Sequence, residues 1–198
     1  MPPDSLPFPP NPSQRSDVNP ALPPLAAWAN FYMIVGSAAA ALTGLQFVVV
    51  AFIADQRAVR REGLEAFGTP TIVHFCAVLL LAAVLSAPWS SARHLALALV
   101  LAAASGLAYT LVVTWRAIRQ KEYTPVLEDW LWHNVFPFAS YVVLVAAAFG
   151  LGPADAWSPF AMAAMTLFLL FIGIHNAWDA VAYNAVQRTE RERPDAAA

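Results

Sequence analysis

Five long apolar stretches, separated by short polar gaps, make up most of this 198-residue chain. Each stretch reaches about 20 residues, enough for an α-helix to cross a hydrocarbon core of about 30 Å. The pattern therefore predicts an all-α fold, a polytopic membrane protein built as a bundle of five transmembrane helices. The expected spans cover residues 28–54, 69–89, 93–115, 130–151 and 157–183.

Polar segments flank the apolar part of the chain. The first 24 residues contain nine prolines, and proline breaks helices because it has no backbone N–H. We therefore expect residues 1–27 to form an extended tail outside the cytoplasm. Residues 28–184 are expected to form the transmembrane domain, and residues 185–198 a short charged tail. The five spans leave no room for a soluble catalytic domain.

The positive charges alternate from gap to gap between the spans. Nine of the eleven Lys and Arg residues fall in the first gap, the third gap and the C-terminal tail; the second gap holds only Arg93, and the fourth holds none. Cytoplasmic loops carry an excess of Lys and Arg. The pattern predicts an N-terminus outside and a C-terminus inside. Because Arg outnumbers Lys and Ala is abundant, as in GC-rich bacteria, the expected location is a bacterial inner (plasma) membrane.

The composition agrees with a membrane protein and excludes some other classes. The chain is 59% hydrophobic and 12% charged, whereas soluble domains are about 25% charged. The net charge of −2 gives no basic excess, so we expect the lipid bilayer rather than a nucleic acid as partner. Cys76 is the only cysteine, which excludes an intrachain disulfide and any Cys-based metal motif.

Two spans carry small residues at four-residue spacing, which lets helix backbones approach closely in lipid. We expect either that these two helices pack together, or that one of these faces contacts another membrane subunit or a second copy of the chain. The two stripes are Gly36, Ala40 and Gly44 in the first span, and Ala98, Ala102 and Gly106 in the third.

Three of the four histidines lie at a similar depth. His74, His133 and His175 each fall within about 10 Å of the cytoplasmic end of a different span, at 1.5 Å per residue. Asp129 and Asp179 lie four residues from His133 and His175, so each pair shares a helix face. Polar groups in hydrocarbon turn toward the bundle interior. We therefore expect one polar cluster at the cytoplasmic leaflet, drawn from His74, His133, His175, Asp179, Asn176, Asp129 and Gln46.

This cluster is compatible with several functions. If it fixes helix register, the chain is a structural or accessory subunit; if its titratable groups line a path, it is a small transport component. Alternatively, three imidazoles and a carboxylate suit a divalent metal such as zinc or iron, and two facing imidazoles suit haem b. That alternative is a metal- or haem-binding membrane redox protein or hydrolase. Because no nucleophile motif or glycine-rich phosphate loop occurs, a non-enzymatic role leads.

The aromatic residues and one internal proline complete the expectations. All seven tryptophans, Trp132 among them, lie near span ends, as in the aromatic belt at a membrane interface. We assign none of them to a binding site. Pro137 lies inside the fourth span and is expected to kink it.

Overall fold

The computed structural model describes residues 25–55, 69–119, 127–152 and 157–191, so most of both expected tails lies outside the described residues. The described residues form helices and short connections, with no β-strand among them. The elements are η2 (a 3₁₀ turn, Leu25–Trp28), α1 (Ala29–Asp55), α3 (Thr69–Ser86), α4 (Ala92–Arg119), α5 (Leu127–Trp130), η4 (a π-helical turn, Leu131–Val135), α6 (Phe136–Gly150) and α7 (Trp157–Arg191).

Four helical segments of the described chain are long and apolar enough to cross a membrane. A fifth, α3, is equally apolar but has only 18 residues, which is about 27 Å of helix. Large apolar side chains also face outward on these helices, where lipid would cover them. The all-α class is thus confirmed for the described residues, and the length and apolar character of these helices suggest a multi-pass membrane protein. The four segments are Leu25–Ala51, Ala92–Arg119, Leu127–Gly150 and Trp157–Ala182.

α3 is short because of the sequence that follows it. It ends at Ser86, three residues before the expected end, since Pro88 disfavours helical backbone at Ala87. The indole N–H of Trp89 then donates to the carbonyl of Val84 at 2.6 Å. That bond satisfies one of the carbonyls that a helix end leaves without a partner. Trp89 therefore caps a helix as well as standing near the end of a span.

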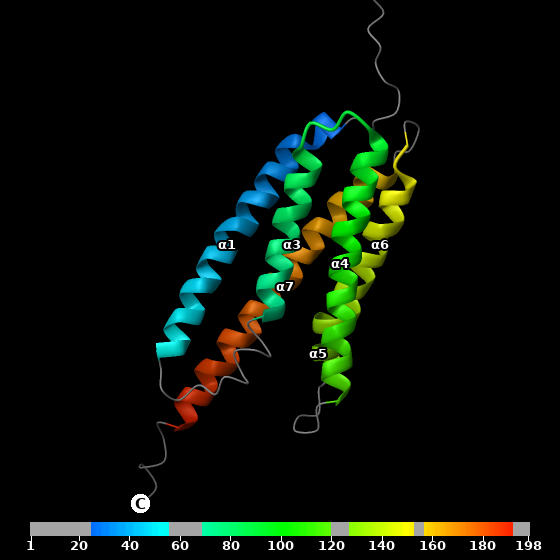
Figure 1. Cartoon of the computed structure of the whole chain (residues 1–198). Helices are drawn as coiled ribbons and strands as arrows, with labels where there is room; N and C mark the ends of the chain where they lie inside the picture. The colour runs from blue at the N-terminus through cyan, green and yellow to red at the C-terminus, as the bar shows by residue number, and fades with distance from the viewer. Residues whose placement is uncertain (1–24, 56–68, 120–126, 153–156, 192–198) are drawn as a thin grey trace, which may run out of the picture.

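The helices alternate in direction and form two layers (Figure 1). α1, α3 and α4 stand side by side at the front, with α3 in the middle. α7 passes behind α3 and contacts α1, α3 and α6, while α6 lies behind α4. The ends of α1, α4 and α7 and the beginnings of α3 and α5 therefore lie at the same end of the bundle.

The small-residue stripes do not join the first and third spans, so that part of the expectation was wrong. α1 packs on α3, where a Cβ at Gly36 would lie 2.9 Å from the Cβ of Ala82. In α4, Gly106 lies directly against the ring of Tyr141 on α6. Gly44 is exposed, and a Cβ added there would meet no atom within 4 Å. Gly36 and Gly106 therefore each make a close contact with another helix, but the two stripes do not contact each other.

Candidate functional site

The polar side chains singled out in the sequence come from four helical elements near the same end of the bundle. His74 is in the second turn of α3, His133 lies in the π-helical turn η4, and His175 and Asp179 lie in the second half of α7. Asp129 is in α5, directly before η4. This end of the bundle holds the beginnings of α3 and α5 and the end of α7 (Figure 1).

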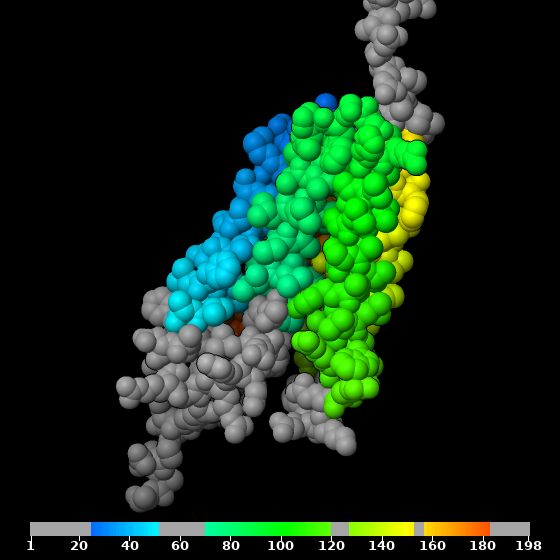
Figure 2. All heavy atoms as spheres, in the orientation of Figure 1, coloured from blue at the N-terminus to red at the C-terminus, as the bar shows by residue number. Residues whose placement is uncertain are grey.

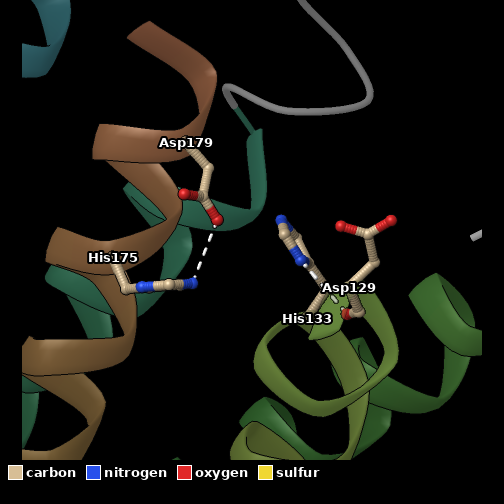
Figure 3. Close-up of polar contacts among 4 residues, drawn as sticks. All are labelled: Asp129, His133, His175 and Asp179. Carbon is tan, nitrogen blue, oxygen red and sulfur yellow. Dashed lines mark hydrogen bonds and ion pairs between the residues drawn. The ribbon is translucent and has the colours of Figure 1, made fainter. Parts of the chain in front are cut away.

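The imidazole ring of His175 contacts Asp179 through its edge and Trp132 through one face. Its Nε2 atom lies 3.0 Å from the Oδ2 atom of Asp179, one turn further along α7 (Figure 3). Trp132 stacks on the imidazole, with ring centroids 3.8 Å apart and an angle of 23° between the planes. Both side chains of the ion pair are partly exposed, at 24% for His175 and 43% for Asp179.

His133 lies across from this pair on η4. Its Nδ1 atom is 3.2 Å from the backbone carbonyl oxygen of Asp129, not from the Asp129 carboxylate. A carbonyl oxygen only accepts, so this bond places a proton on Nδ1 and leaves Nε2 as the acceptor in the neutral ring. His133 is also within electrostatic range of Asp179 and His175. Figure 3 shows the two histidines facing the space between α7 and η4.

His74 lies deeper, between α3 and α6. Its Nδ1 atom forms a hydrogen bond of 3.3 Å with the hydroxyl of Tyr141, and both residues are almost fully buried. Gly106 of α4 makes room for the Tyr141 ring, because any side chain there would overlap it. His74 is electrostatically coupled to His133. One polar bond thus ties α3 to α6 inside an apolar core.

A third polar contact joins α4 to η4. The hydroxyl of Thr114 lies 2.8 Å from Oδ1 of Asn134 and also 2.8 Å from the carbonyl oxygen of Thr110. A threonine hydroxyl has a single proton, so the two acceptors share or compete for it. The bond to Asn134 reaches between helices, whereas the bond to Thr110 stays within α4.

The π-helical turn η4 explains how one short segment reaches two neighbours. The N–H of Phe136 bonds to the carbonyl of Leu131, five residues earlier, so the turn is wider than in an α-helix. Pro137 follows at once, and its ring would crowd the carbonyl of His133 in a regular helix. A wide π-helical turn therefore precedes Pro137, and the expected kink itself stays a prediction. From this turn Trp132 reaches α7, while Asn134 reaches α4.

Two other residues of the expected cluster are buried but stand apart from these contacts. Asn176 of α7 is 2% exposed, and neither its amide nitrogen nor its amide oxygen has a hydrogen-bond partner among the described residues. Gln46 is 8% exposed on α1, which packs on α3 and α7. None of the contacts described above involves either side chain.

The described residues do not form the multi-ligand metal site of the alternative interpretation. Within the described ranges, no three His, Cys, Asp or Glu side chains converge as a metal ion requires. One ring nitrogen of each histidine lies against a protein group: Nδ1 of His74 against Tyr141, Nδ1 of His133 against a backbone carbonyl, and Nε2 of His175 at 3.0 Å from Asp179. Axial ligation of a haem needs an imidazole nitrogen directed at the iron. The interpretation as a metal or haem centre therefore finds no support in these contacts.

Sequence reasoning missed the residues that partner the histidines. The sequence pattern indicates only a belt position for Trp132, and it assigns no role to Tyr141, Asn134 or Thr114. One signal was available for Tyr141, since a tyrosine in the middle of an apolar span carries a hydroxyl that needs a partner. No comparable signal points to the stack of Trp132 on His175, because it depends on how η4 faces α7. Comparison with protein-family models, curated proteins and solved structures finds no match to this chain.

Proposed function

We propose that this chain is an integral protein of a bacterial inner membrane that crosses the bilayer five times, with its N-terminus outside. The antiparallel helices support this course, because the helix ends that border the first and third gaps lie, with the end of α7, at one end of the bundle (Figure 1). Nine of the eleven basic residues lie in those segments and the following tail. By the excess of Lys and Arg in cytoplasmic loops, that end faces the cytoplasm.

Within the membrane, the proposed role is that of a non-enzymatic structural or accessory subunit. The supporting observation is that three polar contacts of the inner end join three different pairs of elements. His74 with Tyr141 joins α3 to α6, Thr114 with Asn134 joins α4 to η4, and Trp132 with His175 joins η4 to α7. A catalytic or metal site needs groups that converge on one reacting atom. Distributed pairs instead select neighbours and register in lipid.

A role as a transport component is less favoured by the same geometry. A solute or proton path needs polar groups through the depth of the membrane. The buried side chains toward the other end of the bundle are mainly apolar, among them Leu85, Leu95 and Met162. The polar contacts between helices that carry this proposal are at the inner end.

Purification of the tagged full chain from its host membrane in mild detergent tests the proposed role. We expect a complex of fixed stoichiometry by native mass spectrometry, without a Soret band and without stoichiometric metal. A Soret band or stoichiometric metal that His175→Ala removes and His94→Ala retains would establish the metal or haem alternative. A chain that leaves its host membrane only as a monomer contradicts the accessory role.

A further inference from the structure

A groove lies between α3 and α4 on the face of the bundle shown in Figure 2. Its volume is about 280 Å³, and it is open to the outside along its length rather than enclosed. Figure 2 shows the hollow between α3 in teal and α4 in green, with atoms of the rear layer visible inside it. The groove is apolar except for hydroxyl and thiol groups. Lining residues include Cys76 and Leu80 on α3, Ala102 and Tyr109 on α4, and Gly106 and Tyr141 at the floor.

The other contacts of α3 and α4 explain why the two helices stand apart. α4 is held against α6 by the close fit of Gly106 on Tyr141. α3 is held against α7, where a Cβ at Gly173 would lie 2.5 Å from the ring of Phe75. These two close contacts hold α3 against α7 and α4 against α6, which are different helices of the rear layer. The groove is therefore built into the packing, and it faces the surface that lipid would cover.

A positive charge lies in line with this groove. Ala102, Tyr109 and Arg116 follow one another along α4 at intervals of seven residues. At 100° per residue, all three lie on one face of the helix, within an arc of about 40°. Arg116 stands in the last turns of α4, about 10 Å beyond Tyr109 along the axis, and the two interact electrostatically. A long arginine side chain reaches the interface from such a position. Arg116 thus lies on the same face of α4 as the groove, about two turns beyond its last lining residue, Tyr109.

We propose that the groove between α3 and α4 binds one acyl chain of an anionic phospholipid, whose phosphate lies at Arg116. An acyl chain needs no hydrogen bonds, and the Ser105 hydroxyl in the groove already donates to the carbonyl of Ala102 at 2.8 Å. A basic residue at the end of a groove between helices is the feature that recognises anionic headgroups. The site depends on the proposed membrane insertion, but not on the accessory role or on the orientation.

The size of the groove favours a lipid chain over a helix from a second copy. A helix with its side chains is about 10 Å across. Ligand pockets for drug-sized molecules begin at about 300 Å³, so a volume of about 280 Å³ suits a thin, flexible chain. A lipid also supplies the negative charge that Arg116 would meet.

Native mass spectrometry of the delipidated full chain in detergent tests this site. Phosphatidylglycerol, which is anionic, is compared with phosphatidylcholine carrying the same acyl chains. We expect the wild type to bind phosphatidylglycerol about fivefold more tightly, the effect of one basic residue near a headgroup. Arg116→Gln should remove this preference, and Arg116→Lys should retain it. Arg93→Gln, at the opposite end of α4, is the matched control and should leave the preference unchanged.

A second variant tests the groove itself. Cys76 is exposed and lines the groove, so Cys76→Phe fills the space without entering the core. It should weaken binding of both lipids while the melting temperature stays close to that of the wild type. Equal binding of the two lipids by the wild type, or a preference that survives Arg116→Gln, would overturn the proposal. A lipid-free dimer that Cys76→Phe dissociates would also overturn it, and would identify a second copy as the occupant.

Discussion

At the scale of single residues, His175 is the best-supported polar group of the inner end. Asp179 contacts its edge at 3.0 Å and Trp132 covers its face. The four-residue spacing in the sequence predicts that His175 and Asp179 share a face, and the structure places them in contact. The tryptophan was not predicted, because a stack between η4 and α7 has no local sequence pattern. The ion pair is partly exposed, which limits the energy that it contributes.

Replacing Asp179 tests the contribution of that pair. We expect Asp179→Ala to lower the free energy of unfolding by about 0.5–1 kcal/mol, as for a partly exposed ion pair. His94→Ala, an exposed histidine in the first turn of α4, should cause no measurable change. Thermal unfolding in detergent measures both variants. Equal melting temperatures for the two would show that the pair does not stabilise the bundle.

The hydrogen bond between His74 and Tyr141 is buried, unlike the partly exposed pair of His175 and Asp179, so losing one partner leaves a polar group unsatisfied in the core. Tyr141→Phe would leave a buried imidazole nitrogen without its partner, which should cost about 1 kcal/mol. When both polar partners are removed, the cost becomes smaller, because no group is left unsatisfied. The double variant His74→Leu with Tyr141→Phe should therefore be less destabilised than the sum of the two single variants. Additive losses in a double-mutant cycle would contradict an energetic coupling between the two side chains.

At the scale of helices, close approaches at three glycines set which elements are neighbours. Gly36 lies close to Ala82, Gly106 to Tyr141 and Gly173 to Phe75, so that a side chain at any of these glycines would overlap its neighbour. These contacts assign α1 to α3, α4 to α6 and α3 to α7. The spacing of small residues predicted that some helix would approach closely, but it did not identify the partner. Gly44 belongs to the same four-residue stripe as Gly36, but a Cβ added there would meet no atom within 4 Å.

Two glycine substitutions separate helix packing from helix propensity. Gly106→Ala places a methyl group against the Tyr141 ring and should destabilise the protein by about 1–3 kcal/mol. Gly44→Ala meets no atom within 4 Å and should be neutral or stabilising by up to about 1 kcal/mol, since alanine favours the helix. Unfolding in detergent with added denaturant compares them. A Gly106→Ala variant as stable as Gly44→Ala would mean that α4 and α6 do not pack as described.

At the scale of the whole molecule, the alternating course of the helices joins the charge pattern to the position of the polar contacts. The parts of α3, η4 and α7 that carry the histidines and the helix ends that border the basic gaps belong to the same end of the bundle. The orientation in the membrane stays a prediction that rests on the placement of the basic residues. The multi-pass character has independent support from the length and apolar character of the helices.

Cysteine labelling tests the orientation in a Cys76→Ser background. A membrane-impermeant maleimide should label Arg93→Cys in intact spheroplasts, because that gap is expected outside. Lys121→Cys should react only after the membrane is permeabilised. Labelling of position 121 in intact spheroplasts would reverse the proposed orientation and would move the polar contacts to the outer leaflet.

The sequence by itself determined the fold class and the places of the spans. In lipid an apolar run of about 20 residues satisfies its backbone groups as a helix, so hydrophobic length alone predicts α1, α4 and α7. Their beginnings differ from the predicted ones by a single residue or less. Larger differences lie at the ends of α3, α4 and α7 and at the start of the fourth span, where α5 begins at Leu127.

Tertiary structure decided the neighbours of each helix and therefore the site. These helices are apolar on nearly every side, so the pattern of side chains does not reveal which face is buried. Small differences in fit choose the partner in lipid, where no hydrophobic force acts between helices. For that reason Trp132 on His175, Tyr141 on His74 and the groove beside α4 emerge only when the helices are packed together.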